Sequence, residues 1–142
     1  MKKKILVSVI SDLVTDQRVQ KECNTLHKIG YDVLLIGRKS ERSFGLHELP
    51  FKTLRFYNFF KRGPLMYLVF NLQLFFYLLF KRGDILWSND LDTLLPNYLV
   101  SRIKRRMLIY DSHEYFTESV YKKTSKKIWL WLEEKIFPHL KN

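Results

Sequence analysis

The sequence contains a single cysteine, Cys23, in 142 residues. One thiol cannot form an intramolecular disulfide, and a reducing cytosolic compartment fits this composition. A single cysteine cannot form the cysteine pairs of common metal sites, and the four histidines are scattered along the chain (His27, His47, His113 and His139). We therefore expect neither a metal site nor a metal cofactor.

Several motifs of well-known enzyme classes are also absent. Without GxGxxG there is no standard dinucleotide fingerprint, and without GxxxxGK[ST] there is no P-loop. The nucleophile elbow GxSxG of serine hydrolases is missing as well. The sequence thus excludes the usual forms of three common α/β enzyme types.

Acidic residues are few beside the basic ones, with 14 Asp+Glu against 25 Lys+Arg and a net charge of +11. This excess favours an anionic partner: nucleic acid, a phosphorylated small molecule or an anionic lipid surface. Nucleic acid is not the expected partner, because no recognised binding motif is present and the basic residues are not interleaved with stacking aromatics. The amino-terminal MKKKILVSVISD resembles a signal peptide, but its apolar run is short and meets Asp12, so we predict a strand there.

The apolar patterning predicts one α/β domain over residues 1–142. Short, nearly continuous apolar runs predict buried strands at 5–10, 32–36, 52–56, 84–87 and 107–110. Helical periodicity predicts helices between Asp16 and Gly30, over 64–80, over 90–104 and from about 125 to 137, with an exposed loop over 37–49. Strands that alternate with helices indicate a Rossmann-like, doubly wound parallel sheet.

Residues 64–80 carry no charged side chain and are flanked by Lys-Arg-Gly on each side. The segment is at the short limit for a bilayer span, which needs about twenty residues, and it lies between two strands of one sheet. On a helical wheel, the apolar half that we expect to face the sheet consists of Leu65, Leu68, Val69, Leu72, Phe75, Phe76, Leu79 and Phe80. The opposite half carries Tyr67, Asn71, Gln73 and Tyr77 and suits an apolar phase outside the domain.

We predict that this outer half touches an anionic membrane surface from the cytoplasmic side, with contacts from Lys61, Arg62, Tyr67, Phe70, Tyr77, Lys81 and Arg82. Basic residues near anionic headgroups favour such contact. Two alternatives remain open: a partner protein could cover this half, or the helix could be buried on both sides beneath the 37–49 loop.

Polar side chains follow three of the predicted strands, at the edge where doubly wound sheets bind ligands. Candidate substrate-binding residues are Ser11, Asp12, Thr15, Asn89, Asp90, Asp111 and Glu114, and the candidate catalytic residue is His113. Each has a structural alternative. Asp12, Asp16 and Asp90 could cap helices, and His113 could serve only as a hydrogen-bonding group.

The segments SDLVTDQRVQKECNTLHKIGYDVLLIG, DILWSNDLDTLLP and MLIYDSHEYFTES resemble the amino-terminal half of a GT-B glycosyltransferase of the retaining family 4. This resemblance implies transfer of a sugar from a nucleotide-sugar to an acceptor, such as a lipid-linked or cell-envelope polysaccharide acceptor, without a cofactor. It implies that this chain holds the acceptor and that His113 lies beside the donor sugar. It also implies a donor-binding carboxyl-terminal domain as a partner, without which the chain is expected to be inactive.

The sequence departs from that family at one motif: Ser11-Asp12-Leu13 stands where a Gly-Gly pair is common. A second function therefore remains open, that of a non-catalytic α/β module that docks on an anionic membrane or a partner protein through the 64–80 helix.

Overall fold

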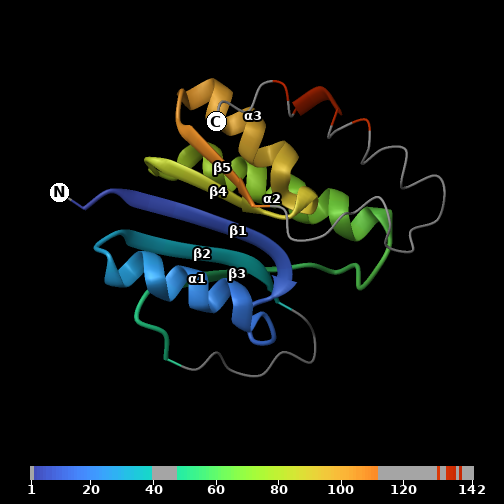
Figure 1. The fold of residues 1–142 in the computed structure, drawn as a ribbon. Helices are drawn as coiled ribbons and strands as arrows, with labels where there is room; N and C mark the ends of the chain where they lie inside the picture. The colour runs from blue at the N-terminus through green and yellow to red at the C-terminus, as the bar shows by residue number, and fades with distance from the viewer. Residues whose placement is uncertain (1, 40–47, 112–130, 132–133, 137, 139–142) are drawn as a thin grey trace.

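The structure is a computed structural model that describes residues 2–39, 48–111, 131, 134–136 and 138. Strands and helices alternate along the described chain except at β2 and β3, which are consecutive among the described elements (Figure 1). They are β1 (Lys4–Asp12), α1 (Gln17–Lys28), β2 (Asp32–Lys39), β3 (Lys52–Tyr57), α2 (Pro64–Phe80), β4 (Ile85–Asn89), a 3₁₀ turn η1 (Leu91–Thr93), α3 (Leu94–Lys104) and β5 (Met107–Asp111).

All five strands are parallel and lie in the order β3-β2-β1-β4-β5. Helix α1 lies on one face of the sheet, and α2 and α3 lie on the other (Figure 1). The strand order reverses between β1 and β4, so the carboxyl ends of these two strands form the topological switch point where doubly wound sheets bind ligands. The Rossmann-like α/β prediction is confirmed.

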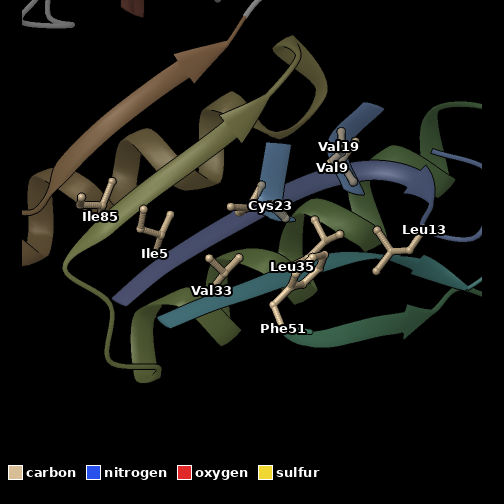
Figure 2. Packing of buried hydrophobic residues seen from close by; sticks show 10 residues of the cluster. Ile5, Val9, Leu13, Val19, Cys23, Val33, Leu35, Phe51 and Ile85 are labelled. Carbon is tan, nitrogen blue, oxygen red and sulfur yellow. The ribbon is translucent and has the colours of Figure 1, made fainter. Parts of the chain in front are cut away.

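The first half of the core fills the space between the sheet and α1 (Figure 2). Val19 and Cys23 of α1 are fully buried against residues of β1 and β2 such as Val7 and Leu35. Full burial of each aliphatic side chain of this kind contributes about 1.5–3 kcal/mol. At Gly37 of β2, a Cβ atom would overlap the Leu13 side chain, so a larger residue here would force the Leu13 side chain to move.

The second half of the core packs α2 against the opposite face of the sheet. Met66, Phe70, Leu74 and Leu78 are spaced four residues apart and are buried. The Phe70 ring meets the Phe56 ring edge-on, with 5.9 Å between centroids. The bounds predicted for this helix are confirmed.

The predicted orientation of α2 is wrong. Most of the half that was expected to face the sheet is exposed: the exposed fractions are 53% for Leu65, 54% for Leu68, 48% for Leu72, 55% for Phe76 and 81% for Phe80. Val69, Phe75 and Leu79 of the same half are partly buried. The alternative of a helix buried on both sides is also wrong. A helix that is apolar on nearly every side gives a weak periodic signal, and the fit against the sheet decides which stripe is buried.

The polar residues of α2 are accommodated locally and do not mark its outer face. Asn71 Nδ2 donates to the backbone oxygen of Tyr67 at 2.8 Å, and Gln73 Nε2 donates to that of Tyr57 at 3.1 Å. Phe70 is completely buried, so its prediction as a membrane-contact residue is wrong. Tyr67 and Tyr77 are half-buried along the flanks of the helix.

Of the helices within the described ranges, none has both the length and the apolar character that crossing a bilayer requires. The expected strands and the first three helices are confirmed, with β2 reaching Lys39 into the segment predicted as a loop. Most of the helix predicted for residues 125–137 lies outside the described residues.

Candidate functional site

The parallel sheet brings the carboxyl ends of β1, β4 and β5 to one edge. Asn89 is the register partner of Asp111, and the backbone N–H of Asp90 donates to the backbone oxygen of Asp111 at 3.0 Å. Ser11 and Asp12 end the neighbouring strand β1. The structure thus gathers most of the predicted site residues at this edge, whereas His113 and Glu114 lie outside the described residues and stay predictions.

The loop after β1 is shaped by its own polar side chains. Ser11 Oγ donates to Asp16 Oδ2 at 2.5 Å, and Asp16 Oδ1 accepts from the backbone N–H of Val19 at 3.2 Å. Asp12 Oδ1 accepts from the backbone N–H of Val14 at 3.2 Å, and Thr15 Oγ1 donates to the backbone oxygen of Asp12 at 3.1 Å. Asp16 therefore caps α1, which confirms the structural alternative predicted for this residue.

A buried polar network lies directly beneath the switch point, and sequence reasoning did not identify it. Ser8, Ser88, Thr93 and Asn97 are all completely buried. The Thr93 hydroxyl lies 2.7 Å from that of Ser88 and within hydrogen-bonding distance of the backbone oxygens of Ser8 and Asn89, at 3.3 and 3.0 Å. Asn97 Nδ2 donates to Ser8 Oγ at 2.6 Å and to the backbone oxygen of Thr93 at 2.8 Å. The network ties β1, β4 and the start of α3 together.

The turn held by this network has two unusual residues. Asp90 has φ 66° and ψ 163°, a region that is almost restricted to glycine and costs about 1–3 kcal/mol for other residues. Asn89 is completely buried, yet neither polar atom of its side-chain amide has a hydrogen-bond partner in the described structure. A buried unpaired amide costs free energy, so both features point to a function for this turn.

Strand alternation places the Asn89 side chain on the face that carries α1. Trp87 and Ile109 pack against the α1-side core, and side chains two residues further along a strand point to the same face. Asn89 and Asp111 therefore lie on that face too. On α1, Arg18 pairs with Asp90, and Glu22 lies close enough to Asp111 to feel its charge. The prediction of the site missed both α1 residues.

Arg18 and Glu22 complete a charged cluster around the switch point. Arg18 Nη2 lies 3.4 Å from Asp90 Oδ2, and its Nη1 is buried with no hydrogen-bond partner among the described residues. Burial is the main cause that raises the pKa of Glu22, and the negative charges of Asp111, Asp16 and Asp90 raise it further, while Arg18 lowers it. The Glu22 carboxyl therefore keeps its proton to a higher pH than a free glutamate and can donate a hydrogen bond.

The arrangement suits a hydroxyl-rich ligand. It offers an amide that both donates and accepts, carboxylates that accept, and one guanidinium group. Within the described ranges, no group of three or more His, Cys, Asp or Glu side chains is placed to hold a metal ion.

Neither a scan against protein-family models nor a search of curated proteins gives a match. Among solved structures, the sucrose-phosphate synthase of Thermosynechococcus elongatus is similar, with a TM-score of 0.61 and 14% sequence identity. The likeness covers 95% of this chain and 40% of that one, which is a GT-B glycosyltransferase. The fold is GT-B-like. At this identity the likeness shows the fold alone, and membership of family 4 and retention of configuration stay predictions.

Proposed function

We propose that this chain is the acceptor-side half of a glycosyltransferase, which transfers a sugar from a nucleotide-sugar to a hydroxyl group of an acceptor. The observation that carries the proposal is the unpartnered, completely buried amide of Asn89 at the switch point of a GT-B-like fold. Under this proposal a donor-binding domain closes over the same edge of the sheet, and the chain without it is inactive.

The side chains at the edge have distinct roles in the proposal. Asn89 is completely buried, so an acceptor hydroxyl reaches its amide only when binding displaces the atoms that cover it. The hydroxyl then satisfies an amide that is otherwise unpaired. Asp111, its register partner on β5, accepts from a second hydroxyl. Arg18 holds Asp90 and thereby fixes the turn that positions Asn89.

Resemblance to the retaining family 4 supports the finer assignments. His113 follows Asp111 by two residues in the sequence and is the proposed catalytic residue beside the donor sugar. Ser11, Asp12, Thr15 and Glu114 complete the proposed substrate-binding set. Cytoplasmic nucleotide-sugars are the proposed donors, so the proposed location is the cytoplasmic side.

The proposal is tested by mapping saccharide binding onto the chain by NMR. A panel of mono- and oligosaccharides should shift the amide resonances of residues 11–16, 88–92 and 111 in the wild-type protein. Asn89→Leu keeps the number and branching of the side-chain heavy atoms but removes both polar atoms, and it should abolish these shifts without unfolding the protein.

A matched control is Asn71→Leu, which removes a largely buried amide from α2, away from the strand ends. It should leave saccharide binding unchanged. Saccharide-induced shifts that persist in Asn89→Leu would contradict the proposed site. Absence of binding by every acceptor class would favour the non-catalytic module instead.

A further inference from the structure

The layer formed by α2 and α3 presents two apolar stripes to the outside. On α2 the stripe consists of Leu65, Leu68, Leu72, Phe76 and Phe80, and on α3 it consists of Leu95, Leu99 and Ile103. The helices lie side by side, and Lys104 Nζ of α3 donates to the backbone oxygens of Leu78 and Lys81, at 3.2 and 2.7 Å, at the end of α2. The two stripes therefore belong to one surface, which we call the α2–α3 face.

Exposed aromatic residues continue this surface at the start of α2. Tyr57, the last residue of β3, is exposed, and so are Phe59 and Phe60 in the segment that joins β3 to α2; Phe59 is 82% exposed. This segment is held in place by Asn58, whose Nδ2 donates to the backbone oxygen of Met66 at 2.8 Å and whose Oδ1 accepts from the N–H of Phe60 at 3.0 Å. Burial of Asn58 thus fixes the aromatics in an exposed position. Monomeric soluble proteins rarely expose contiguous apolar surface on this scale.

A shallow groove of about 530 Å³ runs along the flank of α2. Its lining is mostly apolar and comes from Phe56, Gln73, Phe76, Tyr77, Phe80 and Lys81. An open groove with apolar walls and a cation at one end fits a hydrocarbon chain that bears an anionic headgroup.

Basic residues lie at the ends of the two helices that form the α2–α3 face. Lys61 and Arg62 precede α2, Lys81 and Arg82 follow it, and Arg102 lies in the last turn of α3. Cations at a helix carboxyl end are favoured by the helix dipole, which accounts for those after α2 and in α3. The dipole disfavours cations before a helix, so helix stability does not explain Lys61 and Arg62.

We propose that the α2–α3 face docks on an anionic lipid bilayer surface, with the apolar stripes at the boundary between headgroups and acyl chains. Cations at both ends of α2 and at the end of α3, with an apolar surface between them, are complementary to a negatively charged lipid surface. A second copy of the chain fits less well, because a symmetric pair would bring two identical basic rims together. This docking does not depend on the proposed sugar transfer.

The experiment measures binding of the purified full chain to vesicles by flotation. Vesicles of phosphatidylcholine alone are compared with vesicles that contain about 30% phosphatidylglycerol, and binding should require the anionic lipid. Leu72→Asp places a charge in the centre of the face and should weaken binding at least tenfold. Ile29→Asp makes the same change at an exposed apolar position next to α1, and it should weaken binding less than twofold.

A second pair of variants separates the basic rim from net charge. Arg82→Gln with Arg102→Gln should weaken binding roughly 25-fold, at about fivefold per cation. Lys21→Gln with Lys28→Gln removes the same net charge from α1 and should have a much smaller effect. Equal effects of the two pairs would overturn the assignment of the face.

A third measurement locates the face directly and leaves its apolar character intact. The fluorescence of Phe76→Trp should be quenched by brominated acyl chains beyond the background of the native tryptophans, and that of Ile29→Trp should not. Equal binding to neutral vesicles, or equal quenching in both variants, would overturn the proposal. So would a stable dimer that Leu72→Asp dissociates while vesicle binding is absent, since a second copy would then occupy the face.

Discussion

Asn97 of α3 donates a 2.6 Å hydrogen bond to Ser8 of β1, across 89 residues of sequence. Both side chains are completely buried. Asn97→Ala removes this bond and the one to Thr93 and leaves a cavity, so we expect a loss of about 2–4 kcal/mol in the free energy of unfolding. Ser8→Ala should cost about 1 kcal/mol.

Chemical denaturation of both single variants and the double variant measures the coupling between the two side chains. Residues that share one hydrogen-bond network usually couple by at least about 0.5 kcal/mol. Strictly additive losses would show that the bond does not contribute to holding α3 against β1.

Glu22 should make stability depend on pH in a defined direction. Its pKa is raised in the folded protein, chiefly by burial, above the ordinary value of 4.5. The folded state therefore loses stability as pH rises from 4.5 through the raised pKa, because burial disfavours the charged form that the unfolded chain adopts freely. Glu22→Gln should be more stable than wild type near neutral pH and equal to it well below pH 4.5, as thermal unfolding can measure. A variant that is less stable at neutral pH would contradict the raised pKa.

Replacement of Asp90 by glycine should increase the free energy of unfolding of the protein. Glycine relieves a backbone conformation that costs about 1–3 kcal/mol, whereas the partly exposed ion pair with Arg18 contributes only about 0–1 kcal/mol. Asp90→Ala loses the ion pair and keeps the strain, so it provides the matched control. Urea denaturation should rank the glycine variant above wild type and the alanine variant below it. The reverse order of the two variants would show that the turn carries no strain.

Cys23 should report global unfolding. It is completely buried, and burial raises the pKa of its thiol to about 12. Alkylation at mildly alkaline pH should therefore be very slow in the folded protein and fast in concentrated urea. Rapid labelling of the folded protein would show that α1 opens locally.

The strands and their parallel arrangement could be predicted from the sequence because runs such as ILVSVI and DVLLI are apolar at nearly every position, as strands buried on both faces are. The same apolar character is the reason that the predicted orientation of α2 was wrong. Leu72 and Phe70 are equally hydrophobic, and only the shape of the sheet selects Phe70 for the core. Composition alone contains no information on that fit.

The candidate site was predicted in part. Asn89 and Asp111 were found because strand ends of a parallel sheet converge at one edge. Arg18 and Glu22 were missed because they lie within an ordinary amphipathic helix, and only the packing of α1 brings them to that edge. The polar network was missed for a related reason, although one signal was available: Ser8 interrupts an otherwise apolar strand.

The proposed function is tested most directly by sugar transfer in a mixture of this chain with the donor-binding domain that the proposal requires. Release of nucleoside diphosphate from a panel of nucleotide-sugars is measured in the presence of lipid-linked and polysaccharide acceptors. We predict acceptor-dependent release that falls at least about a hundredfold in Asn89→Leu, which is the scale of loss that follows removal of one preorganised polar group in an active site. Release should be unchanged in Asn71→Leu. Equal rates for wild type and Asn89→Leu would contradict the placement of the functional site at the ends of β1, β4 and β5.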